Sequence, residues 1–150
     1  MRVVIQRVSR ASVSVDGALL SQIGQGLLIL LGVGHEDDRS DIDYLVRKTA
    51  GLRIFPDGDG VMNLDVRQVD GEILVVSQFT LMASTKKGNR PAYIGAAGPE
   101  KAVPLYEEFC RRLSEAVGKP VGTGRFGAHM EVSLVNDGPV TLCIDSRNRE

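Results

Sequence analysis

The sequence predicts an α+β fold, a largely antiparallel β structure with two main helices, in a single domain that spans residues 1–150. Two observations carry this prediction. Strand-like segments follow one another through short turns, and only two segments have the apolar spacing of an amphipathic helix. Because the strands do not alternate with helices, a doubly wound parallel sheet is not expected. A chain of 150 residues is long enough to bury one core.

The first strands are predicted to form a β-meander. Arg2–Val8 is strand-like, and Ala11–Val15 alternates serine with valine, as a half-buried strand does. Asp16-Gly17 is a two-residue hairpin signal that leads into Ala18–Ile23. Leu27–Leu31 is a continuous apolar run, so we expect a strand that is covered on both faces.

Two helices are marked by their caps. The first is predicted to begin at Ser40, a good N-cap residue, and to end at Gly51. The second is predicted to begin near Pro99, because proline suits the first helical position, and to end before Gly118. The buried stripe of the second helix comprises Ala102, Tyr106, Phe109, Leu113 and Val117.

Between and after the helices the pattern predicts turns, strands and one long loop. Residues 57 and 59 are alternating acids in a turn cluster, but they lack the third ligand and the terminal glutamate of a calcium loop. Glu72–Gln78 is the next strand, and Ala83–Gly98 is predicted to be a basic surface loop of a length that is often functional. The closing strands are Met130–Val135 and Val140–Ile144, joined by a tight turn. Ser146–Glu150 is expected to fray.

The composition excludes several classes of function. A formal net charge of −1 provides no global field that would attract nucleic acid or an anionic membrane, so RNA contact requires a local basic patch. Cys110 and Cys143 are far apart in apolar surroundings and are predicted to be small buried hydrophobic residues in a reducing compartment. The sequence has no signal-peptide pattern and no apolar stretch of membrane-spanning length, so a cytoplasmic location is expected.

Two patterns that suggest a cofactor or a metal lack a feature that such a site requires. Residues 122–127 match the dinucleotide fingerprint, but a strand pattern follows them where a helix is required. The same loop offers Arg125 and Phe126 to a phosphate and a base, although the residues alone favour a core position for Phe126. His35 and His129 lack the spacing of metal ligands, so no metal and no cofactor is expected.

Two short strings carry the functional signal. Ser77-Gln78-Phe79-Thr80-Leu81 ends an apolar strand, which places hydroxyls and backbone amides where a substrate reaches them. Asn136-Asp137-Gly138-Pro139-Val140-Thr141 places a glycine and a proline at a tight turn, where the direction of a carbonyl group can be fixed. Neither string contains a strong general base, and the sequence around Ser77 has no nucleophile-elbow pattern that would support a Ser-His-Asp triad.

With these two strings at this separation, the chain resembles the D-aminoacyl-tRNA deacylases from end to end. Shorter segments match the same family. They are Ile5–Val8 with Ala11–Val13, Gly26–Leu28 through Leu31–Val33, Arg53–Phe55, Met62–Leu64, Arg90-Pro91 and Thr123–Phe126.

The resemblance implies an α+β fold whose sheets curl into a barrel-like core, an intertwined homodimer, and an esterase that proofreads tRNA. Its substrate would be a D-amino acid, or glycine, esterified to the terminal adenosine of tRNA. The catalytic residues would be Ser77, Gln78, Phe79 and Thr80, assisted by the ribose hydroxyl of the tRNA. Substrate binding would involve Gly138 and Pro139 of the partner subunit, joined by a cis bond that rejects L-amino acids sterically. Arg7, which supports them, Phe126 and Met130 complete the set of implied binding residues.

Three alternatives remain open at the level of sequence. Thr80 is the candidate for a side-chain nucleophile in the same site. A non-catalytic module that binds the end of tRNA or a peptide is suggested by the basic stretch Lys86–Arg90 and the absence of a general base. A generic serine or threonine esterase would use His35 or His129 as its base.

Overall fold

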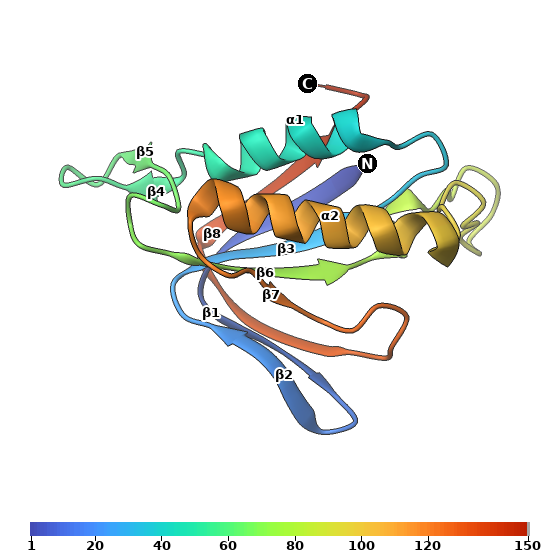
Figure 1. Ribbon diagram of the computed structural model, residues 1–150, viewed down its shortest axis with the longest axis horizontal. Coiled ribbons are helices and arrows are strands. Elements are labelled where there is room, and N and C mark those ends of the chain that lie inside the picture. The colour runs from blue at the N-terminus through green and yellow to red at the C-terminus, as the bar shows by residue number, and fades with distance from the viewer. Residues whose placement is uncertain (150) are drawn as a thin grey trace.

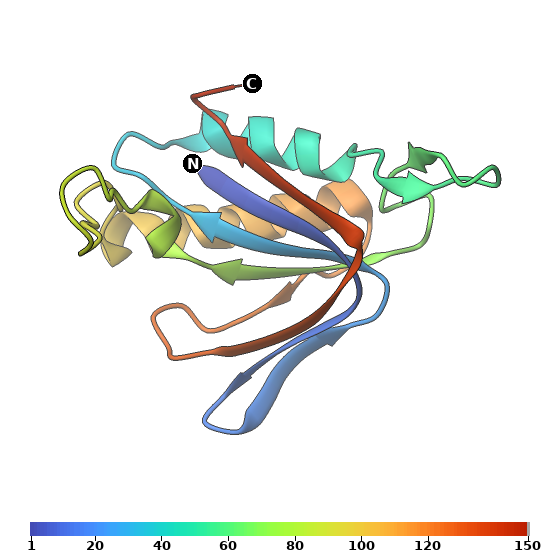
Figure 2. The same cartoon turned by 180° about the vertical axis from the view of Figure 1, so that it is seen from behind.

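The computed structural model describes residues 1–149, which form a strongly curled mixed sheet with two helices side by side on one face (Figures 1 and 2). The helices are α1 (Arg39–Ala50) and α2 (Pro99–Val117), and a short 3-10 helix, η1, spans Phe79–Met82. The strands are β1 (Arg2–Val15), β2 (Ala18–Ile23), β3 (Gly26–Gly32), β4 (Phe55–Pro56), β5 (Met62–Leu64), β6 (Glu72–Ser77), β7 (Gly122–Thr123) and β8 (Glu131–Asp145). The α+β prediction is therefore confirmed.

Strand β1 organises the sheet because it pairs along its whole length on both sides. One side carries β3 and then β2, and the other side carries β8, all antiparallel. The two predicted strands Arg2–Val8 and Ala11–Val15 are thus one continuous strand. The sheet bends along β1 and β8 until β2 approaches β7, which nearly closes it into a barrel (Figure 1).

Two strand pairs are parallel, which the sequence patterns did not reveal. Residues 26–31 of β3 pair in parallel with residues 72–77 of β6, and β6 pairs in parallel with β7. The connection from β3 to β6 runs through α1 and the small β4–β5 hairpin, a crossover that brings the chain back to the same end of the sheet. The expectation that Leu27–Leu31 is covered on both faces is confirmed, since only Leu30 of this run is not fully buried.

The predicted turn at Gly138-Pro139 is wrong in its topology. Both halves of β8 pair with β1 in the same antiparallel direction, and the two halves do not form a hairpin with each other. Gln6 pairs with Thr141 and Val8 pairs with Asn136, so residues 137–140 stand opposite Arg7 alone. The Gly-Pro string is therefore a bulge in one long strand, which we call the 137–140 bulge.

The N-cap of the first helix lies two residues earlier than predicted. Asp38, and not Ser40, is the N-cap of α1, and its side chain accepts a hydrogen bond from the backbone N–H of Ser40 at 2.8 Å. The side chain of Asp41 accepts one from the backbone N–H of Asp38 at 2.9 Å, which completes a capping box. Helix α2 begins at Pro99 as predicted, and Phe109 and Leu113 of its stripe are fully buried.

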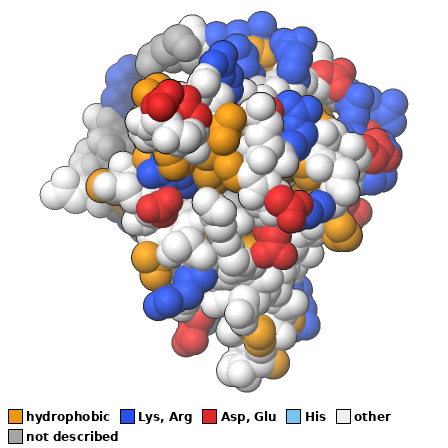
Figure 3. Space-filling model, turned by 90° about the vertical axis from the view of Figure 1, so that its left-hand side faces the viewer, with side chains coloured by type: hydrophobic (Ala, Val, Ile, Leu, Met, Phe, Trp, Pro, Cys, Tyr) orange, Lys and Arg blue, Asp and Glu red, His pale blue; other side chains and the backbone are white. Residues whose placement is uncertain are grey.

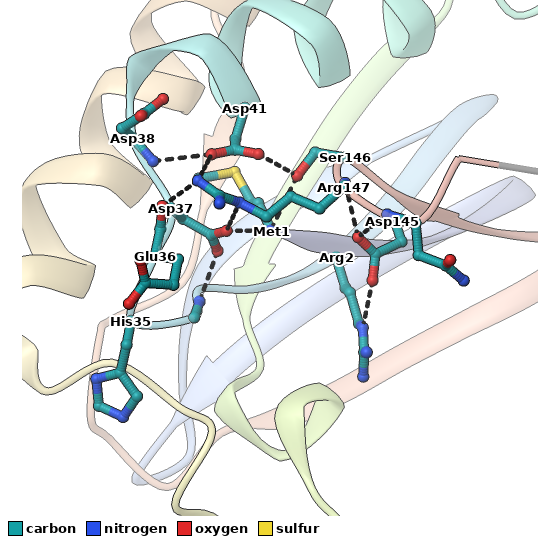
Figure 4. A network of polar contacts seen from close by, with 12 residues as sticks. Met1, Arg2, His35, Glu36, Asp37, Asp38, Asp41, Asp145, Ser146 and Arg147 are labelled. Carbon is teal, nitrogen blue, oxygen red and sulfur yellow. Dashed lines mark hydrogen bonds and ion pairs between the residues drawn. The ribbon is translucent and has the colours of Figure 1, made fainter.

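The predicted frayed tail is ordered over the residues that the structure describes, Ser146–Arg149, and Glu150 lies outside them. Ser146 is buried, and its hydroxyl accepts a hydrogen bond from the Met1 ammonium group and donates one to Asp41. Arg147 lies between two buried carboxylates, 3.3 Å from Asp37 and 3.0 Å from Asp41 (Figure 4). These contacts join both ends of the chain to the start of α1.

The cysteines and the acidic turn can also be compared with their predictions. Cys110 is buried as predicted, but Cys143 is exposed on β8, so its prediction as a buried residue is wrong. In the acidic turn the side chain of Asp57 accepts hydrogen bonds from the backbone N–H groups of Asp59 and Val61. Within residues 1–149 no group of three His, Cys, Asp or Glu side chains is placed to hold a metal ion. Neither helix in this range combines the length and apolarity that crossing a bilayer requires.

Candidate active site

A pocket of about 260 Å³ opens at the C-terminal end of β6, between η1, the start of α2 and the loop of residues 124–130. Five of the predicted site residues line it, namely Ser77, Gln78, Phe79, Phe126 and Met130. No pairing pattern in the sequence implied that the first string would lie beside the 124–130 loop. The parallel pairing of β6 with β7 brings them together.

The first string is positioned by the end of the parallel strand pair. Ser77 pairs with Leu31 of β3, and the backbone N–H of Gln78 donates to the carbonyl oxygen of Leu31 at 2.7 Å. The chain then turns into η1, whose first internal bond is donated by Leu81 to Gln78. The backbone N–H groups of Phe79 and Thr80 have no hydrogen-bond acceptor within residues 1–149. Two unpaired donors therefore follow one another in the chain, and the first of them belongs to a residue that lines the pocket.

The side chains of the string differ in their roles. The Phe79 ring is 55% exposed and meets the ring of Tyr93 edge-on, with 5.1 Å between centroids. The hydroxyl of Thr80 accepts a hydrogen bond from the side-chain amide of Gln78, and Thr80 is not among the residues that line the pocket. Thr80 thus follows the lining residue Phe79 directly in the chain, and its hydroxyl is engaged with Gln78.

The deep wall of the pocket is aromatic and holds no carboxylate. Tyr106 of α2 donates its hydroxyl to the carbonyl oxygen of Val75 at 2.8 Å, and its ring centroid is 6.2 Å from that of Phe126. Burial raises the pKa of Tyr106 well above its ordinary value, and burial also raises the pKa of the nearby Cys110 thiol to about 12. Both groups are neutral near pH 7, so neither supplies a base. The sequence placed Tyr106 in a buried stripe but did not indicate that it faces a pocket.

The two histidines differ in position. His129 is exposed and lines the pocket, together with Val33, Ala97, Ala102, Ala128 and other apolar or small residues. His35 lies outside the lining residues, and its Nε2 atom is 2.7 Å from the carbonyl oxygen of Ile94. Of the two candidate bases for a generic esterase, only His129 has access to the pocket.

The second string lies elsewhere, in the 137–140 bulge. The peptide bond between Gly138 and Pro139 is cis. Arg7 is buried beside the bulge, where its guanidinium donates to the carbonyl oxygen of Asp137 at 3.2 Å and to that of Ile54 at 2.5 Å, and pairs with the Asp137 carboxylate at 3.1 Å. The side-chain amide of Asn136 donates to the carbonyl oxygens of Arg7 and Val140, each at 3.0 Å.

These contacts divide the predicted site residues into two groups. Arg7, Gly138 and Pro139 belong to the bulge, and none of the three lines the pocket that holds the first string. Within one chain the structure does not bring the two groups together. The bulge presents a braced backbone, and the pocket presents unpaired amide donors and aromatic rings.

The chain is similar to proteins of one family. The family model described as D-Tyr-tRNA(Tyr) deacylase matches residues 4–145. Proteins named D-aminoacyl-tRNA deacylase from Bacteroides thetaiotaomicron and from Porphyromonas gingivalis strain ATCC 33277 are 60% and 63% identical over 150 residues, which is 100% of this chain and of each relative.

Solved structures share the fold. A protein titled c-Myc DNA Unwinding Element Binding Protein superposes with a TM-score of 0.92 at 41% identity, covering 97% of this chain and 98% of that one. A probable eukaryotic D-amino acid tRNA deacylase superposes with a TM-score of 0.82 at 17% identity, covering 95% of this chain and 97% of that one, which is a likeness of fold. The chain therefore belongs to the D-Tyr-tRNA(Tyr) deacylase family of ester hydrolases.

Proposed function

We propose that the chain hydrolyses the ester bond between a D-amino acid, or glycine, and the terminal adenosine of tRNA, in the cytoplasm. The single observation that carries the proposal is the pair of unpaired backbone N–H groups at Phe79, which lines the pocket, and at the next residue, Thr80; the lining residues found within 1–149 include aromatic rings and no carboxylate. An aromatic wall suits an adenine base, and paired amide donors suit an oxyanion. Family membership supports the same substrate.

The proposed chemistry needs no general base from the protein. An aminoacyl ester is already activated, and the neighbouring ribose hydroxyl can orient the attacking water and pass a proton from it to the leaving oxygen. Water adds to the ester carbon, and the oxyanion is stabilised by the N–H groups of Phe79 and Thr80. The intermediate then breaks its bond to the ribose oxygen, which takes up the proton that the attacking water has given up through the neighbouring hydroxyl. The products are a free D-amino acid and a tRNA with an intact terminal adenosine.

Selection of the D-enantiomer is proposed to come from a second copy of the chain. The 137–140 bulge lies outside the pocket of its own chain, and we propose a homodimer in which it enters the pocket of the partner. Its carbonyl groups would receive the amino group of the substrate and leave no space for an L side chain. Arg7 and Asn136 suit this task because together they hold the carbonyl oxygens of Asp137 and Val140 in place.

Rates of release of D-tyrosine and L-tyrosine from charged tRNA test the proposal. We expect hydrolysis of the D-ester to be at least about 100-fold faster, a ratio that corresponds to a difference of about 2.7 kcal/mol between the two activation free energies. Equal rates for the two enantiomers would contradict the chiral filter. Binding of tRNA without turnover of any aminoacyl ester would instead favour the non-catalytic module.

Complementation tests the contribution of the partner. A variant altered in the bulge, G138A, and a variant altered in the pocket, F126A, are each expected to be inactive as homodimers. Mixed dimers would contain one site in which both halves are intact, so mixing the two should restore activity to about a quarter of the wild-type level by simple counting of sites. Absence of any recovery in a verified mixed dimer would place both groups in the same chain.

A further inference from the structure

We infer that the loop between η1 and α2, residues 83–98, is a contact surface for the phosphate backbone of the tRNA whose end enters the pocket; this inference rests on the proposed function. The loop contains three cations, Lys86, Lys87 and Arg90, and no aspartate or glutamate. A chain with a net charge of −1 has no overall attraction for RNA, so any contact with RNA requires a local excess of positive charge such as this one.

The basic tip of the loop is held in a fixed relation to the pocket. Ser84 and Ala92 exchange backbone hydrogen bonds at 2.8 and 2.9 Å, which closes the segment between them into a hairpin. Tyr93 follows directly and packs against Phe79, and the backbone N–H of Ala97 donates to the carbonyl oxygen of Val33 at 2.9 Å. Phe79, Ala97 and Val33 all line the pocket. The hairpin is therefore an extension of the pocket wall.

The direction of the loop suits a ligand that is larger than the pocket. In Figures 1 and 2 the loop projects beyond the end of the sheet at which β6 terminates, on the side where α2 begins. The 124–130 loop ends on the same side of the molecule and carries Arg125, which is exposed. A nucleotide chain that leaves the pocket in this direction would pass between the hairpin and Arg125.

The cations of the loop are also free of internal partners. Lys86, Lys87, Arg90 and Arg125 are exposed, and none of them forms an ion pair with a carboxylate of residues 1–149. The end of the molecule that carries the β4–β5 hairpin differs, because Lys and Arg atoms are interspersed there with Asp and Glu atoms (Figure 3). Unpaired cations keep their full attraction for phosphates, whereas paired cations are largely neutralised.

The contact has a kinetic signature. Phosphates of the acceptor end lie outside the pocket, so their contacts would strengthen binding of the whole tRNA without acting on the reacting ester. Loss of these contacts should raise KM for tRNA and leave kcat unchanged. Each lost phosphate contact should also reduce the slope of log kcat/KM against log salt by about 0.7 to 0.9.

The experiment compares three double variants on two substrates. We expect K86A/K87A to raise KM for D-tyrosyl-tRNA about 10-fold and to reduce the salt slope by about 1 to 2, as two lost phosphate contacts predict. K86R/K87R should retain wild-type values, because it keeps both charges. R47A/K48A, which removes two exposed cations from the far end of α1, should also behave as wild type. The D-tyrosyl ester of adenosine, which lacks the RNA chain, should be cleaved equally by all of them.

The outcomes separate this inference from the function on which it rests. If the wild type cleaves D-tyrosyl-tRNA and K86A/K87A shows the same KM and salt slope, the loop inference is overturned and the proposed function stands. Slower cleavage of the adenosine ester by K86A/K87A would show damage to the pocket and would also overturn the inference. If the wild type cleaves neither substrate, the proposed function fails. The Kd for uncharged tRNA then tests whether the loop contacts RNA, and equal Kd values for the wild type and K86A/K87A would overturn the loop inference.

Discussion

Arg7 shows how one buried side chain can define a functional segment. It is the only residue of β1 that faces residues 137–140 of β8, and its planar group reaches Asp137 and Ile54 at the same time. An arginine fork can do this, whereas the single ammonium group of a lysine cannot replace all of these contacts. The side-chain amide of Asn136 donates to the carbonyl oxygens of Arg7 on β1 and of Val140 in the bulge. The backbone of the bulge is therefore braced by side chains that are not part of the pocket.

Gly138 is predicted to tolerate no side chain. Its φ angle is +127°, and an added Cβ would lie 2.9 Å from the Arg7 guanidinium, 2.9 Å from Cγ2 of Val140 and 3.1 Å from the Val140 backbone nitrogen. We expect G138A to lower the free energy of unfolding by about 2–4 kcal/mol, from backbone strain plus steric displacement. G17A is the matched control, because Gly17 has a φ of +76° in open space and should cost only about 1–2 kcal/mol. Equal losses in urea unfolding would show that Arg7 and Val140 do not constrain Gly138.

Thr80 and His129 are predicted to be dispensable for the chemical step. The Thr80 hydroxyl is bound by Gln78 and is not among the lining groups, and the structure places no carboxylate among the lining residues to orient His129. We expect T80A and H129A to keep single-turnover hydrolysis of D-tyrosyl-tRNA within about 5-fold of wild type, because removal of a true general base costs about 10²–10⁴-fold. A collapse in T80A alone would identify a side-chain nucleophile, and a collapse in both would identify a base-assisted nucleophile.

At the scale of single elements, the start of α1 is defined by its polar caps. Asp38 binds the first turn, and Asp41 closes the capping box from inside the helix. The Ser40 hydroxyl donates to the Asp38 side chain and only supports the cap. Hydrogen bonds from Ser40, through its side chain and its backbone, lower the pKa of Asp38, as expected of a carboxylate that accepts donors.

Substitution of the cap residues tests this assignment. D38A should lower Tm by several degrees, because it removes the acceptor that binds the first turn of α1. S40A should lower Tm much less, since it removes only the support of the cap. Thermal unfolding of both variants by circular dichroism gives the comparison. A larger effect of S40A would restore Ser40 as the principal cap.

At the scale of the whole molecule, the two ends of the chain are joined through ionic contacts. Arg2 binds Asp145 at 2.6 Å, and the ammonium group of Met1, Ser146 and Arg147 meet the buried carboxylates at the start of α1 (Figure 4). Burial opposes ionisation of Asp41, but hydrogen bonds from Ser146, the Asp38 backbone and Arg147 outweigh burial and lower its pKa. The ionised Asp41 carboxylate therefore stabilises the folded state.

This network predicts a loss of stability in acid. Burial opposes ionisation of Asp145, but hydrogen bonds from Arg2 and from the backbone of Asn148 and Arg147 lower its pKa from 3.8 to about 2. A folded-state pKa below the unfolded value contributes stability above about pH 4, and this contribution is lost as the pH falls toward 2. We expect the free energy of unfolding to fall over this range, with a smaller fall in D145N and in R2A. An unchanged pH dependence in D145N, measured by urea unfolding, would contradict the role of Asp145.

The sequence by itself determined most of the elements and the candidate residues for the proposed chemistry. Apolar spacing and local turn chemistry identified both helices, most strands and the basic loop, because these signals depend on neighbours in the chain. The strings at Ser77–Leu81 and Asn136–Thr141 were visible for the same reason. The local pattern misplaced the N-cap of α1 by two residues, because Asp38 and Ser40 are both good caps and only the fold of the preceding turn selects between them.

Only the tertiary structure decided how these pieces meet. Pairing partners depend on contacts between distant residues, so the parallel pairing of β3 with β6 and the assignment of Gly138-Pro139 to a bulge opposite Arg7 were not readable from local patterns. The position of Tyr106 was not readable either. The apolar stripe of α2 predicts that Tyr106 is buried, but it does not predict that the residue lines the pocket. The order of Ser146 arises from a partner 145 residues away, the amino group of Met1, which no local propensity can encode.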